Sequence, residues 1–227
     1  MAKILNIETA TTNCSISLAK NGKTIALLEE DKKQIHSEKI HEYILMSLKK
    51  SKTKIKELDA VAVSFGPGSY TGLRIGVSAA KGICFGLGIP LIKISTLKTL
   101  AAKGKKSKQT SLIASVIEAK RQDVFFALYN QKIEEVQKPK MITLKKETLL
   151  KELKLNSILF VGSGAKKTKE HIKNKNATFL TTNPSAKEMA FFSYQKLLKK
   201  KTENIASCEP SYINEFYTTG KKPKSLI

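Results

Sequence analysis

The sequence predicts an α/β protein made of two lobes, each a mixed β-sheet with flanking helices. Three observations point to this fold class. The first hundred residues contain apolar segments in the order strand, strand, strand, helix, strand, helix, strand, helix. The pair Asn21-Gly22, typical of a type I′ turn, joins the second and third segments into a hairpin. The second half broadly repeats this mixed order. We therefore expect an N-terminal lobe over residues 1–104 and a smaller, degenerate C-terminal lobe with a tail over residues 105–227.

The elements of the first half follow from periodicity and from end signals. Ser37 and Ser69 are candidate N-caps of two helices, and Gly88 and Pro90 end the second of them. Residues 60–65, "AVAVSF", form an apolar run typical of a buried parallel strand. The predicted strands are 3–9, 13–20, 23–32, 60–65 and 90–95, and the predicted helices are 37–51, 69–87 and 95–103.

A charged connector, residues 103–110 ("KGKKSKQT"), is the candidate boundary between the lobes. After it, three strands are expected over 111–119, 123–130 and 132–137, with a turn at Asn130-Gln131. A helix over 145–154, strands over 157–164 and 176–182, and a helix over 185–201 complete the lobe. Residues 208–227 are expected to be a tail that packs early and frays late.

Composition narrows the function classes. Of 227 residues 41% are hydrophobic, which excludes a disordered chain, and no apolar stretch reaches the ~20 residues of a membrane span. The three cysteines, Cys14, Cys84 and Cys208, are far apart and are expected to be buried thiols of a cytoplasmic protein. The net charge of +22 favours an acidic partner such as RNA, but only Arg74 and Arg121 are arginine. Lysines that are solvated over the whole surface therefore explain the net charge equally well.

The stretch "SFGPGSYTGLRIG", residues 64–76, does not match the common glycine-rich motifs. It lacks the lysine of a phosphate-binding Walker A loop, the spacing of a dinucleotide fingerprint and the flanking glycine of a nucleophile elbow. Small residues recur at four-residue spacing in the helix that follows, in the row Gly72, Gly76, Ala80 and in a second row at positions 78, 82 and 86. Each helical glycine costs ~1 kcal/mol relative to alanine, so close backbone packing must compensate, either within this chain or against another protein.

Other candidate sites are weaker. Glu8 ends the first strand before the hydroxyl residues that include Thr11, and Gly162 and Gly164 follow a strand of the second half. Together these four residues suggest a vestigial nucleotide site, in which a carboxylate and hydroxyls could hold Mg²⁺ and phosphate. His36 and His41 are five residues apart, whereas a helical metal pair needs a spacing of four. We expect no metal site.

Three segments resemble one bacterial family. "LNIETATTNCSISL", "SFGPGSYTGLRIGVSAAKGICFGLGIPLIKISTL" and "CEPSYIN" are similar to the tRNA threonylcarbamoyladenosine biosynthesis family TsaB (YeaZ type), of the actin-like ATPase superfamily. The resemblance implies two ribonuclease-H-like lobes and a non-catalytic subunit that docks on and activates the catalytic paralogue TsaD together with the ATPase TsaE. That assembly transfers a threonylcarbamoyl group from its AMP ester to the adenosine next to the anticodon of ANN-decoding tRNAs. The histidine metal pair of the paralogue corresponds here to Thr96 and Leu100, neither of which replaces imidazole as a ligand.

The resemblance also implies how the chain meets its partners. The first two long helices, about 37–51 and 69–87, would form a helical bundle with TsaD or, when the chain is alone, with a second copy. The expected partner-binding residues lie on these helices: Ile40, Tyr43, Ile44, Met46, Tyr70, Gly72, Leu73, Arg74, Gly76, Val77 and Ala80. We expect tRNA contact through the complex, no cofactor on the isolated chain, and ATP or ADP with Mg²⁺ only at the complex interface. The alternatives are a kinase-like ATP-binding enzyme or metallopeptidase of the same superfamily, and a tRNA-binding module.

Overall fold

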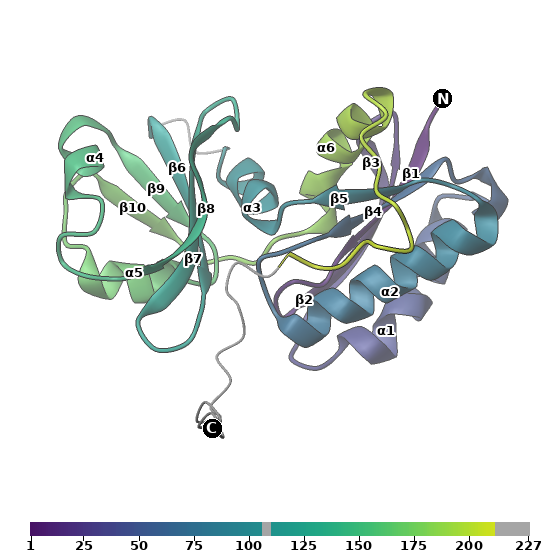
Figure 1. Ribbon diagram of the computed structural model, residues 1–227, viewed down its shortest axis with the longest axis horizontal. Coiled ribbons are helices and arrows are strands. Elements are labelled where there is room, and N and C mark those ends of the chain that lie inside the picture. The colour runs from purple at the N-terminus through teal and green to yellow at the C-terminus, as the bar shows by residue number, and fades with distance from the viewer. Residues whose placement is uncertain (106–109, 212–227) are drawn as a thin grey trace, which may run out of the picture.

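The computed structural model of the chain describes residues 1–105 and 110–211, and it contains two five-stranded mixed sheets, one in each lobe (Figure 1). The first sheet has the order β3-β2-β1-β4-β5 and the second the order β10-β9-β6-β7-β8. In each, the first three strands in the sequence pair antiparallel, and the last two lie parallel to the first. The first sheet contains β1 (Lys3–Glu8), β2 (Asn13–Lys20), β3 (Lys23–Asp31), β4 (Ala60–Ser64) and β5 (Leu91–Ile94). The second contains β6 (Leu112–Glu118), β7 (Asp123–Asn130), β8 (Glu135–Thr143), β9 (Ile158–Val161) and β10 (Ala177–Leu180). The expected fold class, two ribonuclease-H-like lobes with mixed sheets, is confirmed.

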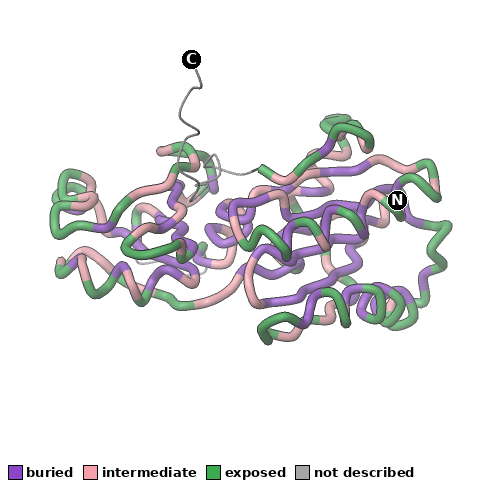
Figure 2. Tube along the Cα trace, turned by 60° about the horizontal axis from the view of Figure 1, so that its bottom comes forward, coloured by how far each residue is buried: buried purple, intermediate pink, exposed green. Residues whose placement is uncertain are grey.

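Helices cover both faces of each sheet. In the first lobe, α1 (His36–Lys50) and α2 (Tyr70–Leu87) lie on one face and α6 (Ala186–Leu198) on the other (Figure 1). In the second lobe, α3 (Thr96–Gly104) packs on one face of the sheet, and α5 (Ala165–His171) and α4 (Leu150–Leu155) cover the opposite core. A short 3-10 helix, η1 (Ile55–Glu57), connects α1 to β4. Figure 2 shows the buried residues concentrated along the strands between these helical layers.

Most helix ends follow from the local sequence. The Ser69 hydroxyl accepts a hydrogen bond of 3.2 Å from the Gly72 N–H and so caps α2, as predicted. Gly88 ends α2 in the left-handed conformation, with φ of 65°. The predicted cap at Ser37 is wrong, because α1 begins at His36 and Ile35 occupies the N-cap position.

Helix α6 returns to the first lobe, although it follows the whole second sheet in the chain. Its start is fixed to β2 by polar side chains that point away from α1: the Ser17 hydroxyl donates to the Ala186 carbonyl at 2.8 Å, and the Ala186 N–H donates to the Ser15 hydroxyl at 2.9 Å. Asn13 donates to the Pro184 carbonyl at 2.8 Å. The N-terminal lobe therefore contains a helix from beyond the expected boundary near residue 104, and the lobes are not a simple division of the sequence.

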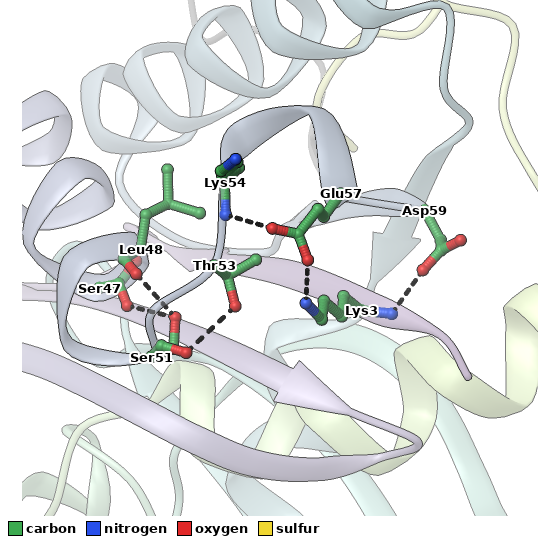
Figure 3. A network of polar contacts seen from close by, with 8 residues as sticks. All are labelled: Lys3, Ser47, Leu48, Ser51, Thr53, Lys54, Glu57 and Asp59. Carbon is green, nitrogen blue, oxygen red and sulfur yellow. Dashed lines mark hydrogen bonds and ion pairs between the residues drawn. The ribbon is translucent and has the colours of Figure 1, made fainter.

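A polar network fixes the far end of α1 (Figure 3). The Ser51 hydroxyl donates to the carbonyls of Ser47 and Leu48, at 2.8 Å and 3.0 Å, and so closes the last turn of the helix. At the end of η1, Glu57 forms an ion pair with the Lys3 ammonium, and the Lys3 N–H donates to Asp59 at 2.6 Å. The network connects the end of α1 to the start of β1, which holds the helix at a fixed place on the sheet.

The last described residues form a strap, defined here as residues 203–211, across the edge of the first sheet. Glu203 pairs with Leu91 of the edge strand β5. Lys81 of α2 donates to the carbonyls of Ala206 and Cys208, at 3.2 Å and 3.3 Å. The strap ends where the Ser211 N–H donates to the Phe65 carbonyl at 2.8 Å. The rest of the expected tail, like residues 106–109 of the connector, lies outside the described residues. Among the described residues, no helix is long and apolar enough to cross a membrane.

Candidate functional site

The first row of small residues in α2 faces the interior of the chain. A Cβ atom on Gly72 or Gly76 would lie well inside 3.0 Å of Thr9, which belongs to the loop between β1 and β2. Gly68, in the turn before the helix, is equally close to the backbone of Ala10. The absence of side chains therefore lets α2 lie directly on this loop. The prediction that the row of Gly72, Gly76 and Ala80 forms a docking ridge is wrong, because this chain itself covers it.

The second row of small residues is open. Gly82 and Gly86 are exposed, and a Cβ atom on either would meet no atom of the described residues within 4 Å. Beside this row, α1 and α2 enclose a shallow groove of about 560 Å³. The groove is lined by residues of both helices: Ser37, Ile40, His41, Arg74, Ile75, Ser78, Ala79, Gly82 and Ile83. Within this lining, Ser78, Ala79 and Gly82 form a stretch of small residues along α2, where a foreign helix can approach closely.

Large apolar side chains are also exposed on the two helices that form the groove. Phe85 is 82% exposed and Leu45 is 65% exposed, and Met46 and Tyr70 are also exposed. The guanidinium of Arg74 lies over the Tyr70 ring, 4.0 Å from its centroid. An exposed phenylalanine beside a small-residue groove is typical of surfaces that bind other proteins. We call this surface the α1–α2 face, defined by the groove residues and by Leu45, Met46, Tyr70 and Phe85.

In the structure, the eleven partner-binding residues expected from the sequence fall into an accessible group and a buried group. Met46, Tyr70 and Arg74 are exposed on the α1–α2 face, and Ile40 contributes to the groove although it is otherwise buried. The other seven residues are buried within the first lobe: Tyr43, Ile44, Gly72, Leu73, Gly76, Val77 and Ala80. Sequence reasoning missed Leu45 and Phe85. Helical spacing places Phe85 about 80–120° around α2 from Val77 and Leu73, in line with Arg74 and Ser78, and an apolar residue in that polar sector was the signal that could have found it.

A second cavity of about 1140 Å³ lies between the lobes. Residues 10–12 of the β1–β2 loop and the first turn of α2 line it on one side, and residues 117–120, Phe125 and Ser163 of the second lobe line it on the other. A nucleotide site of the kind expected from the sequence would need to open into a cavity of this kind. Of the residues expected to form a nucleotide site, only Thr11 lines the cavity.

The other three expected residues do not fit a nucleotide. Glu8 has no exposed surface, and its carboxylate accepts the Ala10 N–H at 2.8 Å inside the loop. Gly162 and Gly164 are buried, and a Cβ atom on Gly162 would collide with the Val116 carbonyl. These glycines allow the chain to pack on itself and leave no space for phosphate. The expected vestigial site of Glu8, Thr11, Gly162 and Gly164 is therefore not assembled around the cavity.

Burial also sets the charge of Glu8. Loss of water raises the pKa of its carboxyl to about 7, although hydrogen bonds from Ala10, Ser64 and Thr9 oppose the shift. Glu8 therefore keeps its proton at pH values below about 7, and a neutral, fully buried carboxyl is a poor ligand for Mg²⁺.

The described residues contain no group of three or more histidine, cysteine or acidic side chains that could hold a metal ion. Thr96 and Leu100, at the positions of the paralogue's histidine pair, have no exposed surface. His36 lies 2.7 Å from the Thr11 carbonyl through its Nε2 atom, whereas His41 lines the groove. The three cysteines are free and buried, as predicted.

Comparisons with known proteins agree on one family. The family described as tRNA N6-adenosine threonylcarbamoyltransferase, TsaD, matches residues 29–219. The tRNA threonylcarbamoyladenosine biosynthesis protein TsaB of Bacillus subtilis is 31% identical over 85% of this chain and 87% of its own length. TsaB of Escherichia coli is 28% identical over 97% and 98%. The solved structure of YeaZ from Pseudomonas aeruginosa, 20% identical, superposes with a TM-score of 0.83 over 93% of this chain and all of its own. The chain therefore belongs to the TsaB family, within the larger family that TsaD represents.

Proposed function

We propose that this chain is a non-catalytic subunit of tRNA threonylcarbamoyladenosine biosynthesis, and that it docks on a TsaD-type catalytic paralogue through the α1–α2 face. One observation carries the proposal: the open glycine row and the exposed Phe85 adjoin a groove between two helices, in a chain whose relatives are named for this pathway. A small-residue groove with an aromatic rim accepts a helix of a partner. In the absence of TsaD, a second copy of the chain would use the same face.

Other members of the same assembly would supply the ATPase and the tRNA-modifying activity that we do not assign to this chain. We place a TsaE-type ATPase in the same cytoplasmic complex and expect tRNA to be modified on the paralogue. Because Glu8 is sealed and Gly162 is packed on Val116, we place any ATP or ADP of the assembly, with its Mg²⁺, at the interface with the partner. The lone chain is then expected to give no heat in calorimetry with ATP and Mg²⁺. Turnover of ATP by the purified lone chain would contradict a non-catalytic role and favour the kinase-like alternative.

The docking proposal is tested by mixing the chain with a TsaD-type paralogue and following the mixture by size-exclusion chromatography and calorimetry. The wild type is expected to co-elute with the partner. Phe85→Glu replaces an exposed aromatic ring beside the groove by a charge and should weaken binding at least about tenfold. Leu155→Glu is the matched control, because Leu155 is 87% exposed but lies on α4 of the other lobe. Separate elution of the wild-type proteins, or equal affinity of Phe85→Glu and the control, would overturn the proposal.

A further inference from the structure

Lysines and phenylalanines gather on the opposite side of the first lobe from the α1–α2 face, where α3 and α6 adjoin β5. Phe191 of α6 is 59% exposed, although nothing in the proposed docking uses it. Lysines from three other parts of the chain surround the same place. We call this surface the α3–α6 patch, defined by Lys93, Lys98, Phe191, Phe192, Lys196 and Lys201.

Direct contacts connect the members of the patch. The Lys98 ammonium lies 5.2 Å from the centre of the Phe192 ring, and that ring packs edge to face against Phe191 at 5.7 Å. One helical turn after Phe192, the Lys196 ammonium donates to the Lys93 carbonyl at 2.7 Å. Phe191 therefore stands at the edge of an ordered group of cations and leaves much of its surface open to a ligand.

The positive charges of the patch are incompletely balanced. Burial is the largest factor that lowers the pKa of Lys196, and the nearby charges of Lys93, Lys98 and Lys201 lower it further. Within the part of the chain that the structure describes, Glu203 is the one group that opposes this shift, and it forms an ion pair of 3.0 Å with Lys93. Three lysines and one carboxylate act on Lys196, so the positive charges around it outnumber the negative one. An anion that binds there relieves the repulsion among the lysines.

We propose that the α3–α6 patch binds single-stranded RNA, with its lysines on phosphates and the Phe191 ring stacked on an unpaired base. Alternating cations and exposed aromatic rings suit single strands, because the bases of a duplex are not available for stacking. The patch contains lysines and no arginine, which favours contact with the backbone over recognition of particular bases. The proposal deepens the proposed function, because the substrate of that pathway is a tRNA with unpaired bases in its loops.

The test measures binding of a labelled single-stranded RNA of about a dozen nucleotides to the lone chain over a range of salt concentrations. Lys98→Gln with Lys201→Gln should weaken binding about tenfold and reduce the slope of log affinity against log salt by about 1.4. Phe191→Ala should weaken binding about tenfold and leave that slope unchanged. The matched controls are Lys173→Gln with Lys175→Gln, and Leu155→Ala, which change exposed residues of the second lobe and should bind like the wild type.

Three results would overturn the assignment: equal losses in the patch variants and their controls, unchanged binding by Phe191→Ala, or equal affinity for an RNA duplex or a polyglutamate peptide. Thermal melting shows that each variant is folded. Docking on the TsaD-type paralogue is the separate readout. The patch variants should dock like the wild type, because α3 and α6 lie away from the α1–α2 face, and a patch variant that loses docking together with RNA binding contradicts the proposal.

Discussion

Gly76 of α2 lies directly over the Thr9 hydroxyl, so closely that even one added methyl group would collide with it. That hydroxyl is buried and has no hydrogen-bond partner among residues 1–105 and 110–211, so no polar bond within these residues explains its place under the helix. The contact is steric: a glycine in the first docking helix fits against a threonine in the β1–β2 loop, at the edge of the cavity between the lobes. The position of α2, and with it the α1–α2 face, depends on this fit.

Gly76→Ala is therefore expected to destabilise the protein by about 1–3 kcal/mol, measured by urea unfolding, because the new methyl group overpacks a buried contact. Thr9→Ala removes the colliding oxygen and should restore most of the loss in the double variant. Gly82→Ala is the matched control in the same helix. Its Cβ atom meets nothing within 4 Å, so alanine should stabilise the helix by up to about 1 kcal/mol. Equal effects at the two glycines would contradict the packing described here.

The pH dependence of stability should report the buried Glu8. Burial raises its folded-state pKa to about 7 from the ordinary 4.5, so the native state keeps a proton that the unfolded state has released. Unfolding then releases a proton between these two values. The stability due to this group is present in full below pH 4.5 and is lost as the pH rises to about 7. The total loss is about 3 kcal/mol.

Glu8→Gln isolates this effect, because the amide cannot ionise. Urea unfolding of the wild type and the variant, at about pH 5 and about pH 8, separates Glu8 from all other titrating groups. The wild type should lose about 3 kcal/mol more than the variant over this range. If the free energy of unfolding changes with pH in the same way in the wild type and in Glu8→Gln, then Glu8 ionises normally and has access to water.

Local signals predicted both ends of α2 but not the face that it buries. The Ser69 cap and the Gly88 stop depend on neighbours within a few residues, and both were predicted. The two rows of small residues in α2, in contrast, are nearly equal in sequence. Gly76 is buried and Gly82 is exposed because Thr9, far away in the chain, lies under one and not the other. No periodicity within the helix contains that information.

The burial of the polar residues of β2 also depends on a part of the chain that is distant in sequence. Alternation of apolar and polar side chains is typical of a strand with one face in water. Here Ser15 and Ser17 have no exposed surface, because α6 arrives from about 170 positions later in the chain and covers them. The candidate nucleotide residues failed for a related reason: a glycine that permits close packing of the chain and one that admits a phosphate look alike in sequence.

The contact between β2 and α6 gives a further prediction. Ser15→Ala removes the acceptor of the Ala186 N–H, which lies in a buried part of the interface. A buried donor without a partner costs about 1–3 kcal/mol, so the free energy of unfolding should fall by that amount. Thr24→Ala removes a longer bond, of 3.3 Å, to the Lys187 carbonyl at the exposed end of the same contact, and should cost less than about 0.5 kcal/mol. A larger effect at Thr24 than at Ser15 would mean that water reaches the centre of the interface.

The strap offers a chemical readout of its attachment to α2. Lys81→Met keeps the aliphatic stem but removes the ammonium that donates to the Ala206 and Cys208 carbonyls, so the strap should open more often. Cys208 is only 6% exposed, and burial is the main cause of its raised pKa, so its thiol should react slowly with a disulfide reagent in the wild type. Loss of the Lys81 hydrogen bonds should lower the free energy of opening the strap by about 1 kcal/mol. The labelling rate of Cys208 in Lys81→Met, followed by mass spectrometry, should therefore rise about fivefold or more. Cys14, which has no exposed surface in the centre of the first lobe, is the internal control and should keep its rate. Acceleration at both cysteines would indicate unfolding of the whole lobe, and acceleration at neither would mean that backbone pairing with Leu91 and Phe65 is sufficient to hold the strap.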